Sequence, residues 1–390
     1  MEIRLENLTK VFTGNKGDKS GTTAVDNLDI TIPDGKLVGL LGPSGCGKST
    51  TLYMISGLLE PTSGKIWFGD EDVTEISPEH RGIGLVFQNY ALYPHMTVRR
   101  NIAFPLENLR VEEEVVDKNG KAQIKKRKLT KAEIDIRVME AAKLVQIEEY
   151  LDRKPNQLSG GQQQRVAIAR TLAPRPKVLF MDEPLSNLDA KLRLEMRTEL
   201  KRLHLETNST FVYVTHDQLE AMTLATNVCL MKEGLLQQYE PPLKVYSEPN
   251  NLFVADFVGN PTMNFVNCSA KQISERELEI DFHGTPLRFM CNEEMKLENE
   301  EVVLGIRPEH IVLSKTGLKA KVYSTLPSGM ETTVKIFFND DILTSVVFGI
   351  IDYAVDTEVH LQFTSNHIVL FDKESTNRIA IGELKMPSEE

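Results

Sequence analysis

Short apolar runs alternate with helical patterns over the first 234 residues of the chain. The segments "KLVGLLG" (36–42), "KVLFMDEP" (177–184) and "TFVYVTH" (210–216) are short, apolar and bounded by turn residues or charge, so each predicts a buried strand. The segment 190–206 repeats apolar residues at helical spacing and predicts an amphipathic helix. Its predicted apolar stripe consists of Leu192, Met196, Leu200 and Leu203. Strands that alternate with helices predict an α/β domain.

The pattern changes after "KEG" at 232–234. The remaining chain contains short runs rich in Val, Ile, Thr and Phe, such as "VVLGI", "TTVKIFF" and "EVHLQF", which are separated by turn residues. Such runs predict a mostly β region with small barrels. We therefore predict a first domain over residues 1–235 and a β-rich second domain over residues 236–390, with the boundary near 235 to 245.

Composition and charge restrict the classes of function. The longest apolar runs, "LVGLL" and "VLFM", are far shorter than the roughly 18 to 20 residues that cross a bilayer, so we expect no membrane span. The start "MEIRLENLTK" lacks the pattern of a secretory signal, which predicts a cytoplasmic location. The four cysteines lack metal-ligand spacing and are interpreted as structural thiols.

The formal net charge of −11 lies in the second domain. Residues 235–390 contain 13 Lys and Arg against 24 Asp and Glu, and nucleic acid would repel such a domain. By contrast, "KNGKAQIKKRKLTK" (118–131) contains seven basic residues and no acidic one. It predicts a solvated helical hairpin or loop tip, with contact to an acidic partner or to lipid headgroups as the alternative.

A phosphate-binding loop follows the first predicted buried strand. The segment "GPSGCGKST" fits the P-loop pattern and lies between that strand and an apolar helix. Its glycines let backbone N–H groups face anionic oxygens, Lys48 supplies a charge for the β and γ phosphates, and the Ser49 hydroxyl can bind Mg²⁺. The predicted nucleotide-binding residues of this loop are Gly42, Pro43, Ser44, Gly45, Cys46, Gly47, Lys48, Ser49 and Thr50.

Two adjacent carboxylates end the predicted strand at 177–184. In a P-loop fold an acidic residue at this position lies beside the metal of the nucleotide. Neighbouring carboxylates at a strand end point in different directions, so we predict that Asp182 holds Mg²⁺ and that Glu183 acts as general base on the attacking water.

A second glycine-containing phosphate loop, "LSGGQQQR" (158–165), lies more than a hundred residues after the first. With "GPSGCGKST", "LSGGQQQR" and "VLFMDEP" in this order, the chain resembles the ATP-binding cassette (ABC) ATPases. The resemblance covers about residues 1–240. It implies a P-loop NTPase core with a helical subdomain at about 89–170, followed by an all-β, OB-like domain of the TOBE type.

The resemblance also explains why one chain carries two phosphate loops. ABC ATPases pair head to tail, and each nucleotide lies between the P-loop of one subunit and the LSGGQ signature of the other. The resemblance therefore implies a homodimer, or a heterodimer with a similar ATPase. The signature residues that would meet ATP across the interface are Ser159, Gly160, Gly161 and Gln162.

Four further residues take their roles from this resemblance. Gln88 in "VFQNYALYPHMTV" matches the Q-loop and implies a residue near Mg²⁺ and the attacking water. Asp189 in "LSNLDA" matches the D-loop, which belongs to the nucleotide site. His216 in "VTHDQ" matches the switch histidine, which contacts the γ-phosphate. Phe12 falls where relatives carry an aromatic residue that stacks on adenine.

One cassette joined to a β-rich domain resembles the ATPase subunits of bacterial importers, in particular those of maltose, multiple sugars and glycerol-3-phosphate. "GNPTMNF" and "LGIRPEHI" match the β domain of that subgroup. The implied partners are two transmembrane permease subunits and an extracellular substrate-binding protein, at the cytoplasmic face of the membrane. The implied function is ATP hydrolysis that powers carbohydrate uptake.

Three alternatives remain open from the sequence. The cargo could be a polyamine, iron or sulfate. The chain could be a soluble cassette ATPase that acts on DNA or ribosomes, although it lacks the tandem cassettes or long heptad runs of that class. It could also be a regulatory module that no longer hydrolyses ATP, although Lys48, Asp182, Glu183 and His216 are all present. The loop 14–23, the basic stretch and Pro105 depart from the importer pattern.

Overall fold

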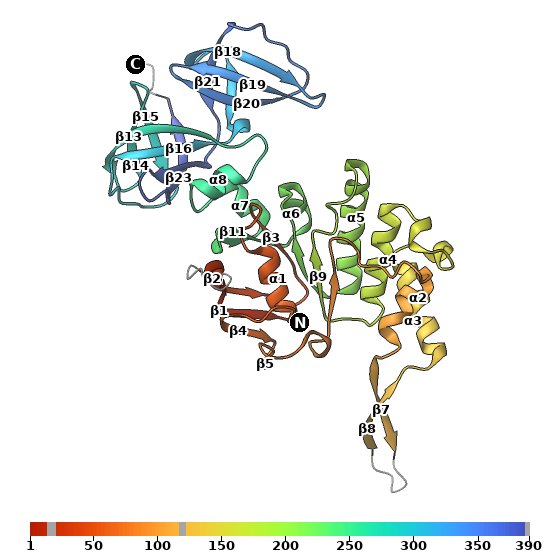
Figure 1. Cartoon of the computed structure of the whole chain (residues 1–390). Helices are drawn as coiled ribbons and strands as arrows, with labels where there is room; N and C mark the ends of the chain where they lie inside the picture. The colour runs from red at the N-terminus through yellow and green to blue at the C-terminus, as the bar shows by residue number, and fades with distance from the viewer. Residues whose placement is uncertain (14–20, 117–121, 387–390) are drawn as a thin grey trace. The chain divides into compact units, whose positions relative to one another are not determined.

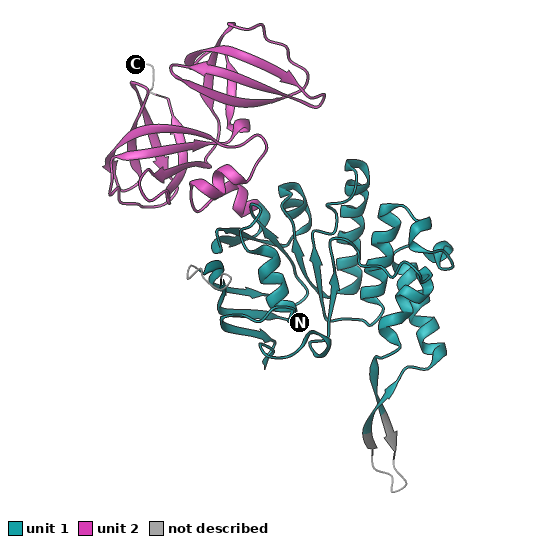
Figure 2. Ribbon diagram, in the orientation of Figure 1, with its two compact units in different colours: residues 1–242 teal, residues 243–390 magenta. Residues whose placement is uncertain are grey.

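The computed structural model describes residues 1–13, 21–116 and 122–386. Parts of the long loop 14–23 and of the basic stretch 118–131 therefore lie outside the described residues. The chain divides into two units, Met1–Pro242 and Leu243–Glu390 (Figures 1 and 2). The division falls seven residues after residue 235 and within the predicted boundary region of 235 to 245. The reason is that β12 (Leu235–Glu240) pairs with β11 (Asn227–Lys232) and so completes the first unit.

The core of the first unit is a six-stranded sheet in the order β12-β11-β3-β10-β9-β6. All pairs are parallel except β11 with β12. The three predicted buried strands are confirmed as β3, β9 and β10, in which every residue is buried. The four parallel strands besides β11 are β3 (Leu37–Leu41), β6 (Ile83–Val86), β9 (Val178–Asp182) and β10 (Thr210–Val214).

Successive side chains of these strands enter two different cores, as the period of a β-strand requires. On β9, Val178 and Phe180 join a core shared with the antiparallel sheet β2-β1-β4-β5, whereas Leu179 and Met181 join a core shared with the helices. Burial on both faces explains why these strands are continuous apolar runs. The antiparallel strands are β1 (Ile3–Phe12), β2 (Thr22–Ile32), β4 (Ser63–Phe68) and β5 (Glu71–Asp72).

Helices cover the parallel sheet, and the predicted amphipathic helix is confirmed as α5. Three of its four stripe residues are buried, and the fourth, Leu192, packs against the same core. The helices of this part are α1 (Lys48–Ser56), α5 (Ala190–Thr207) and α6 (Gln218–Leu224). None of the described helices combines the length and the apolar character needed to cross a bilayer.

The segment predicted as a helical subdomain contains three helices and a β-hairpin. The helices are α2 (Val98–Ala103), α3 (Lys131–Leu144) and α4 (Gly160–Leu172), and side chains of all three lie in one core cluster. Between α2 and α3, β7 (Arg110–Val116) pairs with β8 (Ala122–Lys128).

Residues 122–128 of the basic stretch form β8, so the predicted helical hairpin is wrong for these residues, whereas residues 118–121 lie outside the described residues. Residues 122–128 belong to a strand because the acidic run on β7 faces the basic run on β8. Glu112 lies opposite Lys126, and the Arg127 guanidinium binds the Glu113 carboxylate at 3.0 Å. Opposite charges on facing strand positions stabilise an antiparallel pair.

The second unit consists of two β assemblies preceded by two short helices. The first is a closed barrel in the order β13-β14-β15-β23-β22-β16, and the second is a five-stranded sheet in the order β17-β21-β18-β19-β20. The helices and barrel strands are α7 (Pro242–Ser247), α8 (Leu252–Phe257), β13 (Asn264–Ser274), β14 (Glu277–Phe282), β15 (Thr285–Cys291), β16 (Glu301–Ile306), β22 (Ile368–Asp372) and β23 (Arg378–Lys385). The sheet strands are β17 (Ile311–Ser314), β18 (Leu318–Pro327), β19 (Glu331–Phe338), β20 (Asp341–Phe348) and β21 (Glu358–Phe363).

Candidate functional site

The P-loop connects the end of β3 to the start of α1. Two of its glycines are required by close backbone contacts. At Gly42 (φ 148°) a Cβ atom would lie 2.2 Å from the carbonyl oxygen of Met231, and at Gly47 (φ 102°) it would lie 2.3 Å from that of Ala24. The loop therefore keeps a backbone path that side chains would block. It leads into the first turn of α1, whose N–H groups lack partners within the helix and can bind an anion.

Lys48 is held inside this loop. Its side chain is 5% exposed, and Nζ donates hydrogen bonds of 2.8 Å to the carbonyl oxygens of Gly42 and Pro43. Cys46 lies beside it, with Sγ 3.7 Å from Nζ, and burial raises the pKa of the Cys46 thiol. All four cysteines are free thiols, as expected for structural cysteines.

Asp182, the last residue of β9, binds two hydroxyl groups from α1. Ser49 Oγ donates to Oδ1 at 2.9 Å, and the hydroxyl of Tyr53 donates to Oδ2 at 2.6 Å. Burial, and then the hydrogen bond to Asp182, raise the pKa of Tyr53 to about 12. Tyr53 was not among the residues predicted from the sequence, although its spacing of four residues from Ser49 places both on one helix face.

Glu183 contacts a different set of side chains. Its backbone is left-handed (φ 41°). Its carboxylate lies between His216 and Gln88: Oε1 is 3.2 Å from His216 Nδ1, and Oε2 is 3.5 Å from Gln88 Nε2. The structure thus brings together the three residues predicted as catalytic, from three separate segments. The adjacent carboxylates of Asp182 and Glu183 have separate partners, which is the arrangement needed for separate roles.

Two residues that sequence reasoning missed hold Gln88 in place. Ser186 Oγ accepts a bond of 3.3 Å from Gln88 Nε2, and Asn187 Nδ2 donates at 2.8 Å to the Gln88 carbonyl. Both follow Glu183 closely in "DEPLSNLD", so a single turn after β9 orients the Gln88 side chain and backbone.

The position of His216 is fixed by buried groups on either side. Glu220, which is 3% exposed, accepts hydrogen bonds from the hydroxyls of Tyr213 and Thr215 at 2.7 and 2.8 Å. Asp217 caps α6 by accepting from the Leu219 backbone N–H. The His216 side chain itself is 56% exposed, so its ring can meet a ligand while its backbone stays fixed.

The LSGGQ signature forms the start of α4. Ser159 is the N-cap, since its Oγ accepts from the Gln162 N–H at 3.4 Å, and its own N–H donates to Gln162 Oε1 at 2.9 Å. Gly161 is buried against α5, where a Cβ would lie 2.7 Å from Leu192 Cδ2. Ser159 and Gly160 are exposed, and α4 lies well to one side of α1 in Figure 1. The signature therefore presents a helix N-terminus to the surface.

The last two predicted residues flank these loops. Asp189 is the N-cap of α5, where Oδ1 accepts from the Leu192 N–H at 3.0 Å. Phe12 ends β1 opposite Thr22 and is 43% exposed, with Lys10 Nζ lying 5.4 Å from the ring centre. Its exposed face is available to a flat ligand.

The donors near the P-loop suit a magnesium ion. Ser49 and Asp182 offer a hydroxyl and a carboxylate 2.9 Å apart, and Mg²⁺ prefers oxygen ligands and is commonly held by one or two protein groups together with phosphates and water. Among the described residues there is no cluster of three or more His, Cys, Asp and Glu side chains that could hold a metal by itself. The site therefore fits a metal that arrives with a nucleotide.

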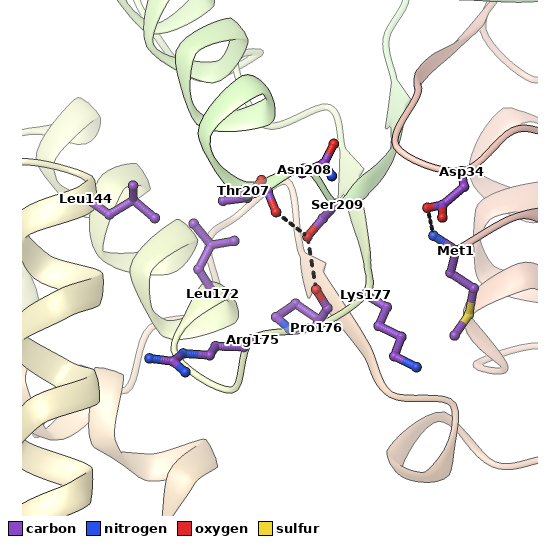
Figure 3. Close-up of a pocket in the computed structure, with 10 residues that line it drawn as sticks. All are labelled: Met1, Asp34, Leu144, Leu172, Arg175, Pro176, Lys177, Thr207, Asn208 and Ser209. Atoms are coloured by element: carbon purple, nitrogen blue, oxygen red, sulfur yellow. Dashed lines mark hydrogen bonds and ion pairs between the residues drawn. The ribbon is translucent and has the colours of Figure 1, made fainter.

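A pocket of about 640 Å³ lies away from these residues (Figure 3). It is lined by the residues that precede β9 and β10, including Lys177 and Ser209, and by Leu144 and Leu172 from helices. Glu183 and His216 follow the carboxyl ends of the same two strands. The pocket is therefore at the opposite edge of the sheet and does not belong to the P-loop site.

Two family profiles match the chain. The profile described as ABC transporter matches residues 25–186, and the profile described as MalK OB fold domain matches residues 259–311. The first match contains the P-loop, the signature and the carboxylate pair. The second covers the start of the barrel.

Curated relatives align over most of the chain. A xylose/arabinose import ATP-binding protein from Haloferax volcanii is 42% identical and covers 96% of this chain and 94% of its own length. An oligosaccharides import ATP-binding protein from Bacillus subtilis is 39% identical, and the alignment covers 97% of this chain and 99% of the relative. A trehalose/maltose import ATP-binding protein from Thermococcus litoralis is 45% identical, and the alignment covers 79% of this chain and 78% of the relative.

Solved structures resemble the first unit. The dimeric ABC transporter cassette MJ0796 is 33% identical with a TM-score of 0.51, and covers 62% of this chain and 98% of its own. The structure of cbiO1 from Clostridium perfringens is 31% identical with a TM-score of 0.53, and the match covers 63% of this chain and 90% of cbiO1. The predicted fold, an ABC ATPase followed by an OB-like domain, is thereby confirmed. The chain belongs to the ABC transporter family, as an ATP-hydrolysing import ATP-binding protein.

Proposed function

We propose that this chain powers the import of a carbohydrate, a sugar, an oligosaccharide or a related polyol phosphate, by hydrolysing ATP in a head-to-tail dimer. The ATPase part rests on one observation: Gln88 and His216 both contact the Glu183 carboxylate beside the P-loop. The cargo class is supported by the relatives named above, which import pentoses, disaccharides and oligosaccharides.

The P-loop binds the phosphates of ATP. Lys48, now bonded to two loop carbonyls, turns its ammonium group toward the β and γ phosphates, and the N–H groups of the loop and of the first turn of α1 bind their oxygens. The ring of Phe12 stacks on adenine, for which it keeps an exposed aromatic face. Binding thus uses backbone donors for the phosphates and one side chain for the base.

Hydrolysis proceeds by attack of water on the γ-phosphorus. Glu183 accepts the proton of this water, while His216 and Gln88 hold the carboxylate and contact the γ-phosphate and the water. Ser49 and Asp182 would hold Mg²⁺, with Gln88 in reach of it, and the ion would supply positive charge against the charge of the β and γ phosphates. The bond to ADP breaks as the new bond to the water oxygen forms, so the products are ADP and phosphate.

The second half of each site comes from another subunit. Ser159, Gly160, Gly161 and Gln162 bring an exposed helix N-terminus to the γ-phosphate across the interface, and Asp189 lies at the same interface. ATP then closes the dimer, and hydrolysis reopens it. We place the dimer at the cytoplasmic face of the membrane, where residues 88–97 contact two permease subunits that an extracellular binding protein supplies.

Transport in reconstituted vesicles tests the proposed cargo. The chain is co-purified in detergent with its two permeases, reconstituted with the binding protein and supplied with ATP and a panel of labelled sugars and glycerol-3-phosphate. We expect ATP-dependent accumulation of at least one carbohydrate, and none with a Lys48→Ala chain in the same complex. Accumulation of only a polyamine, iron or sulfate would reject the cargo class, and failure to co-purify with any permease would reject import.

A further inference from the structure

Two hydroxyl groups of α1 face the same carboxylate. Ser49 and Tyr53 are separated by four residues, which is about one helical turn, so both side chains project from one side of α1. That side meets the carboxyl end of β9, where Asp182 is 6% exposed. The P-loop helix therefore supplies two donors to a buried acid.

Each carboxylate oxygen receives one of these donors. Ser49 Oγ lies 2.9 Å from Oδ1, and the Tyr53 hydroxyl lies 2.6 Å from Oδ2. The second distance is typical of a charge-assisted O–H···O⁻ bond, which is the stronger kind. Rotation of an Asp carboxylate about its last bond is otherwise soft. Two donors on two oxygens fix the plane of the carboxylate, whereas one donor would leave it free to turn.

Resting on the proposed function, we infer that Tyr53 is a positioning residue that fixes the Asp182 carboxylate in the orientation needed for magnesium. Ser49 can bind the metal through an oxygen lone pair while its proton stays on Oδ1. Tyr53 holds Oδ2 and would act on the metal only through this carboxylate. Hydrogen bonds of this kind to a metal-binding carboxylate commonly change metal affinity or activity by about 10- to 100-fold when they are lost.

The donor is itself held firmly. The Tyr53 ring packs against the core shared by the parallel and antiparallel sheets, which includes Leu52, Ile55 and Phe180. This contact belongs to the ring and not to the hydroxyl. Tyr53→Phe therefore keeps the packing and removes only the bond to Asp182, which separates a positioning role from a structural one.

The test measures ATP affinity and needs no turnover. All chains carry Glu183→Gln to prevent hydrolysis, and the Kd of ATP is measured with saturating Mg²⁺ and with EDTA. The reference chain, Tyr53→Phe, Asp182→Asn and Tyr239→Phe are compared. Tyr239 is the matched control, because its hydroxyl donates to the backbone carbonyl of Thr31 at 2.9 Å in the same unit. Fluorescence of Trp67, the only tryptophan, reports folding of this unit.

We expect Mg²⁺ to tighten ATP binding in the reference chain and in Tyr239→Phe. In Tyr53→Phe this gain should be about tenfold smaller, with the Kd in EDTA unchanged. A full Mg²⁺ gain in Tyr53→Phe, with the gain lost in Asp182→Asn, would overturn the inference alone. A weaker Kd in EDTA would also overturn it, since Tyr53 would then act on the P-loop. No Mg²⁺ gain in the reference chain would reject the metal site at Asp182 together with the inference.

Discussion

Replacing Glu183 with glutamine is expected to slow ATP hydrolysis at least about a hundredfold while ATP still binds. Glutamine keeps the size of the side chain and an oxygen for His216, but it cannot accept a proton from water. Because the P-loop and Asp182 are untouched, nucleotide affinity should stay near that of the unmodified chain. Phosphate release and equilibrium ATP binding measure the two quantities separately.

An exposed glutamate provides the control for this substitution. Glu195 lies on the solvent side of α5, and Glu195→Gln makes the same chemical change away from the site. We expect it to hydrolyse ATP at the normal rate. Near-normal turnover by Glu183→Gln would remove Glu183 from its role as general base, and lost ATP binding would mean that this carboxylate supports the fold of the site.

Replacing Ser159 with arginine should abolish hydrolysis and leave the ATP affinity of the chain largely intact. The exposed start of α4 would then present a long cationic side chain where the proposed interface needs a hydroxyl and close backbone N–H groups. The P-loop of the same chain is unchanged, so a single subunit should still bind ATP. Phosphate release and ATP binding again distinguish the two effects.

The substitution also removes a helix cap, which costs about 1 kcal/mol. Thr130→Arg is a matched control, because Thr130 caps α3 through the same type of reciprocal bonds with Glu133. We expect Thr130→Arg to retain hydrolysis. If Ser159→Arg lost affinity in proportion to its activity, the signature would act in its own subunit, contrary to the proposed dimer.

Local apolar pattern was sufficient to predict the core of the first unit. The runs at β3, β9 and β10 are buried on both faces, so their composition alone indicated strands. The P-loop was also predictable, because its glycine pattern lies between a predicted strand and a predicted helix. The structure adds the reason for Gly42, which is the Met231 carbonyl that lies against it. The resemblance to the ABC ATPases then implied that Gln88, Glu183 and His216 belong to one site.

Features that depend on pairing between distant segments were not predictable. The basic run around Lys126 resembles a solvated helix until the acidic strand that carries Glu112 is placed beside it. The boundary between the units was predicted only as a region near 235 to 245, because β12 shows its place in the first unit only through pairing with β11. Tyr53 was missed because its spacing from Ser49 places both on one helix face but does not show that Asp182 faces them.

Each nucleotide site is proposed to combine the P-loop of one subunit with the signature of the other. Mixing two inactive chains tests this sharing directly. Lys48→Ala disables the P-loop and Ser159→Arg disables the signature, so neither chain should hydrolyse ATP alone. In a mixed dimer, the intact P-loop of the Ser159→Arg chain faces the intact signature of the Lys48→Ala chain. We predict that phosphate release reappears when the two chains are refolded or co-expressed together. A mixture that stays inactive at every ratio, although mixed dimers have formed, would contradict the shared site.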